Sequence, residues 1–299
     1  MILYRGFTKL YGALRAVAGL DLEIGAAEVV ALLGPNGSGK TTALKAAAGL
    51  IHPSAGDVLL GPERRPAGSP AARRSLSFLP QKVAFPESLS GREVLEFYRR
   101  LRGAPRERTG EVLRFASLNG AGGRAVGTYS GGMLQRLGLA VAMLPDAPVL
   151  LLDEPTAALD PDGLCAFYGV AQRHRDEGRT VFFTSHQLGD VERLADRCAV
   201  LVEGRLVAIF TQRELADRLA DGGHLRLLLG PFRPALLATA RQLAPLARWE
   251  GDELIAPCTA AQRAAVLAAV REAGGEIRGI STQEGRIDVL YRELVRESR

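Results

Sequence analysis

Cysteine is scarce in the 299-residue sequence, and the spacing of its three cysteines argues against two kinds of site. Cys165, Cys198 and Cys258 lie far apart, and none belongs to a CxxC or a Cys/His ligand pattern. We therefore expect neither a disulfide framework nor a structural metal site. The three residues are interpreted as reduced, partly buried thiols.

Long apolar runs are missing as well. No stretch approaches the roughly 18 consecutive apolar residues that a membrane-spanning helix needs. The first residues, Met1 to Gly6, lack the charged-then-apolar pattern of a signal peptide. We expect the chain to stay in the cytoplasm.

Lysine occurs only at positions 9, 40, 45 and 82, so arginine supplies nearly all the positive charge behind the net charge of +5. The arginine clusters are pairs, and none forms the block of five or six like charges expected of a nucleic-acid-binding arm. A solvated, arginine-rich surface is favoured over a nucleic-acid groove, and it is also compatible with attraction to an anionic membrane face. We expect no nucleic-acid partner.

A glycine-rich loop stands between an apolar strand and a helix-favouring segment. The strand is predicted over Val29 to Leu33, and the loop GPNGSGKT follows it directly. This is a P-loop in its required strand-loop-helix context, whose backbone N–H groups turn toward phosphates. Lys40 should reach the β- and γ-phosphates, and the Thr41 hydroxyl should ligate Mg²⁺. The residues expected around the phosphates are Gly34, Asn36, Gly37, Ser38, Gly39, Lys40, Thr41 and Thr42.

Two carboxylates and a histidine follow later strands. An apolar strand ending at Leu152 precedes Asp153 and Glu154, and the strand Val181 to Ser185 precedes His186. Ligands of open α/β sheets bind at the carboxyl ends of the strands, where these side chains emerge. Asp153 can organise Mg²⁺ with Thr41, Glu154 can orient or deprotonate a water molecule, and His186 can hold the γ-phosphate. The alternatives are a helix cap for the acidic pair and a structural histidine.

The middle and the end of the chain change pattern. From Ser90 to about Gly127 the periodicity is helical, which predicts a helical insertion between two halves of the sheet. Ser130 can cap a helix running to about Leu144, so Ser130, Gly131 and Gly132 make a second phosphate-friendly helix N-terminus. Ile2 to Tyr11 is predicted to be an edge strand. Beyond a linker at 221–223, strands and helices alternate up to a terminal amphipathic helix (287–295), compatible with a ferredoxin-like α+β domain. That domain is interpreted as a dimerisation, regulatory or purely structural module.

The order of these motifs resembles that of the nucleotide-binding subunit of an ABC transporter, from Ile2 to Leu219. YSGGM at 129–133 resembles the signature of that family, and VLLLDE at 149–154 resembles its second magnesium-site motif. In this resemblance Tyr11 stacks on adenine, and Gln81 senses Mg²⁺ and links the nucleotide to the helical subdomain. The segment 158–160, which contains Asp160, crosses a dimer interface, and His186 is the switch histidine.

The resemblance implies an α/β P-loop NTPase fold and an ATPase that uses ATP and Mg²⁺. An ATPase domain over 1–220 would hold a helical subdomain over about 82–145, and 224–299 would form the accessory domain. Two copies would dock head to tail, so that Ser130 and Gly132 of one complete the site built on Lys40 of the other. This homodimer would drive an integral membrane permease from the cytoplasmic face of the membrane. Val83, Phe85 and Leu89 form either a docking patch for that permease or part of the subdomain core.

The stretch from Leu79 to Ala104 and the small C-terminal domain look most similar to one branch of the family, the ATPase of the copper-processing transporter that matures nitrous-oxide reductase. That branch also uses an extracytoplasmic accessory protein. Exporters of drugs or polysaccharides share most of these features and are the alternative. Soluble, non-transport ABC ATPases remain a further alternative, although the chain has one ATP cassette and no room for a very long coiled coil between Lys40 and Asp153.

Overall fold

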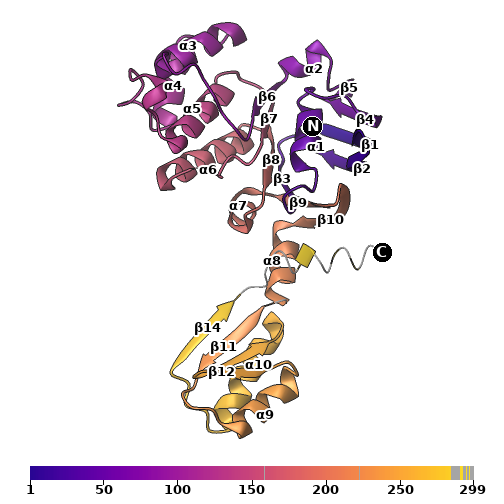
Figure 1. Cartoon of the computed structure of the whole chain (residues 1–299), viewed down its shortest axis with the longest axis vertical. Coiled ribbons are helices and arrows are strands. Elements are labelled where there is room, and N and C mark those ends of the chain that lie inside the picture. Colours follow the sequence, from indigo (N-terminus) through magenta and orange to yellow (C-terminus); the bar gives the residue numbers. More distant parts are fainter. Residues whose placement is uncertain (158, 222, 284–289, 292–293, 295, 297–299) are drawn as a thin grey trace. The chain divides into compact units, whose positions relative to one another are not determined.

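The computed structural model describes residues 1–157, 159–221, 223–283, 290–291, 294 and 296. The chain forms two compact units, Met1–Ile209 and Phe210–Arg299 (Figure 1). Among the described residues, no helix combines the length and the apolar character required to span a bilayer. Cys198 and Cys258 are buried, whereas Cys165 is exposed on the helix α6 (Pro161–Asp176).

A six-stranded sheet carries the carboxyl ends that were expected to hold the site. Its order is β10 (Arg205–Thr211), β9 (Arg197–Val202), β3 (Val29–Leu33), β8 (Thr180–Ser185), β7 (Val149–Leu152) and β6 (Leu76–Leu79). The pairs β9–β3, β3–β8, β8–β7 and β7–β6 are parallel. Every residue of β3, β7 and β8 is buried, which explains why these strands are continuous apolar runs in the sequence.

A second sheet of the first unit is antiparallel, with the order β2 (Leu14–Ile24), β1 (Ile2–Tyr11), β4 (Ala55–Leu60) and β5 (Arg65–Pro66). The prediction that Ile2–Tyr11 is an edge strand was wrong, because β1 pairs with β2 on one side and β4 on the other. The alternation of apolar residues reports which face of a strand is buried. It does not report how many strands pair with its backbone.

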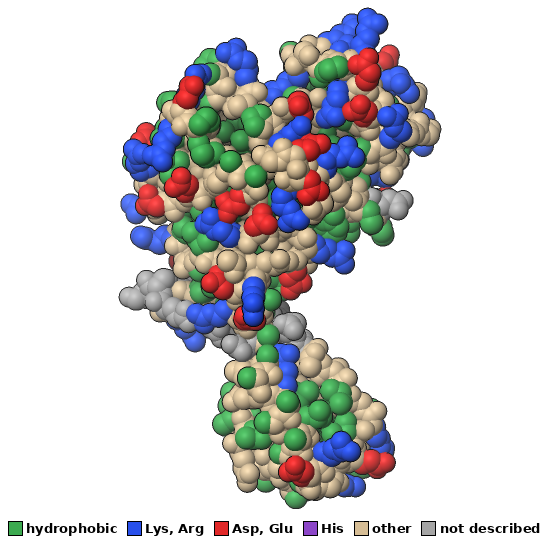
Figure 2. Space-filling view, turned by 180° about the vertical axis from the view of Figure 1, so that it is seen from behind, with side chains coloured by type: hydrophobic (Ala, Val, Ile, Leu, Met, Phe, Trp, Pro, Cys, Tyr) green, Lys and Arg blue, Asp and Glu red, His purple; other side chains and the backbone are tan. Residues whose placement is uncertain are grey.

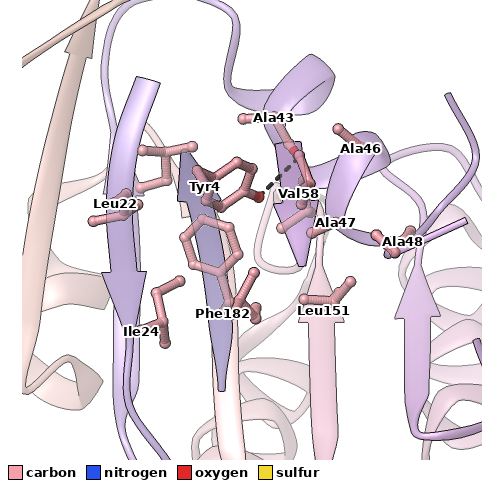
Figure 3. Packing of buried hydrophobic residues seen from close by; sticks show 14 of the residues in the cluster. Tyr4, Leu22, Ile24, Ala43, Ala46, Ala47, Ala48, Val58, Leu151 and Phe182 are labelled. Atoms are coloured by element: carbon pink, nitrogen blue, oxygen red, sulfur yellow. Dashed lines mark hydrogen bonds between the residues drawn. The ribbon is translucent and has the colours of Figure 1, made fainter. Parts of the chain in front are cut away.

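The helix α1 (Lys40–Ala47) packs into a core shared by both sheets. Its buried alanines lie beside Leu22, Ile24 and Val58 of the antiparallel sheet and beside Leu151 and Phe182 of the parallel sheet (Figure 3). The Tyr4 hydroxyl donates a hydrogen bond of 2.9 Å to the carbonyl oxygen of Ala43. Small side chains let the helix approach closely, so the P-loop at its amino end is held by a dense core.

Helices make up the rest of the first unit. They are α2 (Pro70–Arg74), α3 (Gly91–Arg102), α4 (Glu107–Phe115), the 3₁₀ turn η1 (Val126–Thr128), α5 (Gly131–Met143), α6 (Pro161–Asp176) and α7 (Leu188–Leu194). The helices α3, α4 and α5 pack on one another (Figure 1), as expected of a helical insertion. Ser90 and Glu93 form a capping box at the start of α3, which explains where the helical pattern begins.

The second unit begins with the end of β10 and with α8 (Gln212–Asp221) and continues as a β-α-β-β-α-β fold. Its elements are β11 (His224–Leu228), α9 (Pro234–Leu243), β12 (Arg248–Glu250), β13 (Glu253–Pro257), α10 (Ala260–Glu272) and β14 (Gly279–Gln283). The sheet order is β12-β13-β11-β14 and all three pairings are antiparallel, as in a ferredoxin-like domain. The predicted strict alternation of strands and helices was wrong, because β12 and β13 are consecutive and pair with each other. Most of the predicted terminal helix, 287–295, lies outside the described residues.

Candidate functional site

The P-loop follows β3 and ends at the first turn of α1. Gly39 precedes this helix with a left-handed backbone (φ 99°), and a Cβ atom there would lie 2.4 Å from the carbonyl oxygen of Ala16. A Cβ on Gly34 would lie 2.1 Å from the carbonyl oxygen of Leu201. Glycine is therefore required at both positions, because neighbouring backbone fills the space of any side chain.

The Lys40 ammonium group is buried beside this loop. Its Nζ donates hydrogen bonds to the carbonyl oxygens of Gly34 (2.8 Å) and Pro35 (3.1 Å), and lies 3.9 Å from Oε1 of Glu154. Burial lowers the pKa of Lys40, and the carboxylates of Glu154 and Asp153 oppose that shift. A phosphate would supply the negative charge that this buried cation needs.

Asp153 ends β7 with a side chain that is 1% exposed. Its Oδ1 accepts hydrogen bonds from the hydroxyls of Thr184 (2.8 Å) and Thr41 (3.1 Å). Burial raises the pKa of the Asp153 carboxyl, while these two hydrogen bonds act in the opposite direction. The other oxygen, Oδ2, is buried and has no hydrogen-bond partner among the described residues.

The donors around Asp153 fit Mg²⁺. Oδ2 of Asp153 is a buried carboxylate oxygen with no hydrogen-bond partner among the described residues, and the Thr41 hydroxyl lies 3.1 Å from Oδ1. Both groups are hard oxygen ligands, which Mg²⁺ prefers. Among the described residues there is no cluster of three or more His, Cys, Asp or Glu side chains suited to a metal. A site with one carboxylate agrees with that finding, because Mg²⁺ usually keeps water and phosphate oxygens as its remaining ligands.

Glu154 is the point on which the other polar side chains converge. Its Oε2 accepts a hydrogen bond of 2.9 Å from the Gln81 amide and lies 3.6 Å from Nδ1 of His186. Its backbone has a left-handed conformation (φ 46°), which is uncommon for a residue other than glycine and marks local strain. The Glu154 N–H donates a hydrogen bond of 2.8 Å to the hydroxyl of Thr184. The carboxylate is thus held where it can act on a water molecule beside the P-loop.

A hollow of about 730 Å³ unites most of the predicted residues. Its lining includes Tyr11, whose side chain is half exposed, with the Lys9 ammonium group 5.2 Å from the centroid of the ring. The predicted residues that line it are Tyr11, Asn36, Gly37, Ser38, Gly39, Lys40, Thr41, Thr42, Gln81, Glu154 and His186. These side chains come from β1, the P-loop and the ends of three strands, so the fold brings them to one place.

Six predicted residues do not line this hollow: Gly34 and Asp153, which lie at the ends of β3 and β7, and Ser130, Gly131, Gly132 and Asp160. Ser130 caps α5 by accepting a hydrogen bond from the Met133 N–H (3.2 Å), with Gly131 and Gly132 in the first turn. Asp160 caps α6 through the Gly163 N–H (2.9 Å) and lies 3.4 Å from Nη2 of Arg136. The helix cap predicted at Ser130 is confirmed, whereas contacts of these residues with nucleotide remain a prediction. Ala158 lies outside the described residues.

The sequence did not single out several residues of the site. Thr184 joins Asp153 to the Glu154 backbone, but a threonine inside an apolar strand gives no distinctive signal. Glu203 and Gly204 line the hollow and form the turn before β10, where the Gly204 N–H donates to the Ser38 carbonyl oxygen (3.1 Å). A Glu-Gly pair indicates only a turn, and its place beside the P-loop follows from the fold.

The parallel sheet, the glycine-rich loop and the carboxylates at the strand ends define a P-loop nucleoside triphosphatase. Residues 17–157 match the family model described as "ABC transporter". A daunorubicin resistance ATP-binding protein of Streptomyces coeruleorubidus is 34% identical over 98% of this chain and 95% of its own length. The chain therefore belongs to the ABC transporter family and is an ATP-binding, ATP-hydrolysing subunit of such a transporter.

Further comparisons agree with this assignment. The linearmycin resistance ATP-binding protein of Bacillus subtilis is 29% identical over 82% of this chain and 80% of its own length. The solved structure of the ATP-binding cassette MJ0796, a dimer in a post-hydrolysis state with ADP and Pi, has a TM-score of 0.66. It is 25% identical and covers 71% of this chain and 99% of its own. The predicted fold class and ATPase activity are confirmed.

Proposed function

We propose that this chain powers an exporter by hydrolysing ATP at the cytoplasmic face of the membrane, while a separate integral membrane permease carries the cargo. The observation that carries the proposal is the match, along nearly the whole chain, to an ATP-binding protein of daunorubicin resistance. A second relative is named for linearmycin resistance. These names favour the exporter over copper processing with an extracytoplasmic accessory protein, which rested on Leu79 to Ala104 and the C-terminal domain alone.

In this proposal each ATP lies between the P-loop of one chain and the start of α5 in a second copy. Within one chain, Ser130, Gly131 and Gly132 lie outside the hollow that Lys40 lines, so a second chain is needed to bring the two loops together. The dimer reported for MJ0796 supports this arrangement. Helix α5 begins at Gly131, and its free N–H groups suit a phosphate.

The roles proposed for the site follow its contacts. Tyr11 stacks on adenine, Lys40 and the P-loop N–H groups bind the phosphates, and His186 contacts the γ-phosphate. Thr41, Gln81 and Asp153 would hold Mg²⁺, which neutralises phosphate charge when it is bound. Glu154, kept in place by Gln81 and Thr184, orients the attacking water and accepts its proton.

The docking surface for the permease is assigned to α3. Of the residues considered from the sequence, Phe85 packs on the Tyr98 ring (6.0 Å between centroids), and the Val83 side chain lies against Gly138 of α5. Both therefore contribute to packing of the helical segment. Phe97 and Leu101 on α3 are 59% and 67% exposed, and Phe97 contacts the same Tyr98 ring. The Tyr98 ring therefore contacts both the segment after Gln81 and the exposed Phe97 side chain of α3.

Replacing Glu154 by Gln tests the proposed chemistry. The variant should lose turnover by at least about 100-fold, because the amide cannot accept a proton, yet it should keep ATP-dependent dimerisation. Phosphate release and size-exclusion chromatography with ATP measure the two effects. Lys40→Ala is the matched control, since it should weaken nucleotide binding itself. Unchanged turnover in Glu154→Gln would refute the assigned role, and absence of ATP-dependent dimers would refute the shared site.

A further inference from the structure

Asp190, on α7, is a buried carboxylate that the proposed chemistry does not use. Its side chain is 2% exposed, and three hydroxyl groups donate hydrogen bonds to it. Thr156 Oγ1 lies 2.7 Å and Ser185 Oγ 2.8 Å from Oδ2, while the Tyr168 hydroxyl lies 3.1 Å from Oδ1. Hydrogen bonds to a charged acceptor are short and strong, so this group holds its three partners firmly.

Two of the three donors belong to the segments that carry Glu154 and His186. Thr156 follows Glu154 by two positions, and Ser185 directly precedes His186. The Ser185 hydroxyl also accepts a hydrogen bond of 2.9 Å from the Gln187 N–H, so it constrains the backbone on both sides of His186. The third donor, Tyr168, comes from α6 and from neither segment.

We propose that Asp190 is a positioning residue that keeps the Glu154 carboxylate and the His186 ring at their working separation. Glu154 Oε2 and His186 Nδ1 lie 3.6 Å apart, and each residue is attached to a segment that Asp190 anchors. Asp190 thus adds a second link between the loop after β7 and the turn after β8, beyond the hydrogen bond from the Glu154 N–H to the Thr184 hydroxyl. The inference rests on the proposed roles of Glu154 and His186.

The carboxylate matters because it can accept from all three hydroxyls at once. Thr156 and Ser185 donate to the same oxygen, so an asparagine could keep both contacts with its amide oxygen and turn its NH₂ group toward the Tyr168 hydroxyl. Alanine has no side-chain acceptor, so Asp190→Ala should release both segments.

The test compares kcat, the KM for ATP and thermal stability in four single variants of the full chain. Asp190→Ala should lower kcat about 10- to 100-fold with KM within about twofold, because the chemistry is misaligned while the P-loop is untouched. Thr156→Val and Ser185→Ala should each lower kcat in the same way. Tyr168→Phe removes an equivalent hydrogen bond from the helix side and should keep kcat within about twofold of the wild-type value.

The outcomes separate the inference from the proposed function. A wild-type protein without ATP turnover would overturn both. Wild-type turnover with unchanged kcat in Asp190→Ala would overturn the positioning role alone. The role also fails if Tyr168→Phe lowers kcat as much as Ser185→Ala at an equal loss of melting temperature, because the network would then be only structural. A double variant of Ser185→Ala and Asp190→Ala should be no slower than Asp190→Ala, since both changes break the same link.

Discussion

Thr184 is the residue on which the geometry of both acidic side chains depends. Its one hydroxyl donates to Asp153 Oδ1 and accepts from the Glu154 N–H, and the residue is fully buried. The strained backbone of Glu154 therefore has a specific partner, which compensates for its conformation.

Replacing Thr184 by Val should damage the site more than the fold. The change leaves the Glu154 N–H without its partner, which costs about 1–3 kcal/mol of unfolding free energy. We expect kcat to fall by about tenfold or more, because Glu154 and Asp153 both lose a positioning contact. Thr184→Ser keeps the hydroxyl and serves as the control. Wild-type kcat in Thr184→Val would contradict the positioning role.

Tyr4 lies in the core between the two sheets, and burial raises the pKa of its hydroxyl above the ordinary value. In the unfolded chain this hydroxyl ionises near pH 10. Above that pH the unfolded state loses a proton that the folded state keeps, so the Tyr4 contribution to stability is complete below about pH 10 and declines as the pH rises further.

Tyr4→Phe isolates this effect. At pH 7 to 9 the variant should be less stable by about 1 kcal/mol, since it lacks the hydrogen bond to Ala43. Above about pH 10 that difference in stability should shrink and then reverse. Ionisation of Tyr4 then stabilises the unfolded state of the wild-type chain, and the variant has no such group. Denaturant unfolding at each pH measures it. A difference that stays constant up to pH 11 would show that Tyr4 ionises equally in both states.

At the scale of elements, α3 carries two exposed apolar side chains, Phe97 and Leu101. Phe97→Asp should remove most of the permease that co-purifies with the wild-type protein, because a charge cannot replace an aromatic contact in an apolar interface. ATP affinity should stay within about twofold, since α3 contributes no residue to the hollow. Quantitative mass spectrometry of gently solubilised membranes provides the measurement.

Leu50 provides a matched control for that experiment. It is 56% exposed, close to the value for Phe97, and follows α1 rather than belonging to the helical segment. Leu50→Asp should leave the permease bound. Equal loss of the permease in both variants would mean that the apolar surface of α3 has no special role.

The elements also differ in how much of them the sequence could predict. The parallel strands β3, β7 and β8 were predictable, because burial on both faces requires a continuous apolar run. The place of β1 inside its sheet was not, since backbone pairing leaves no mark on side-chain alternation. The start of α5 was predictable from the Ser130 cap, because that contact is local in sequence.

At the scale of the whole molecule, the division into two compact units has a thermodynamic consequence. Each unit has its own buried cluster, one around Tyr4, α1 and Phe182 and one formed by β11, α9 and α10. Two units with separate cores need not unfold together. We retain the assignment of 1–220 to the ATPase domain and 224–299 to the accessory domain as a proposal.

Calorimetry of the full chain should show two unfolding transitions. ATP with Mg²⁺ should raise the midpoint temperature of only one of them. A ligand at 100 times its dissociation constant stabilises the unit that binds it by about 2.7 kcal/mol, and the other unit gains nothing. Lys40→Ala should abolish the shift without altering the second transition. A single transition that shifts as a whole would mean that the two units unfold cooperatively.

The surface of the molecule carries both signs of charge. Figure 2 shows lysine and arginine side chains interspersed with aspartate and glutamate over the face in view. Several arginines have acidic partners, as at Arg99 with Glu96 and Arg197 with Glu28. The net charge of +5 is therefore distributed over paired and unpaired groups, and the expectation of no nucleic-acid partner stays a prediction.

The sequence by itself determined the P-loop, the acidic pair and the class of protein, because these features depend on residues close together in the chain and on strands whose burial is visible as apolar runs. Only the tertiary structure decided which distant groups meet. Gln81 and His186 reach Glu154 from separate strands, Thr184 joins Asp153 to Glu154, and Asp190 joins Thr156 to Ser185. Such contacts follow from the packing of strands and helices, and local residue patterns carry no record of that packing.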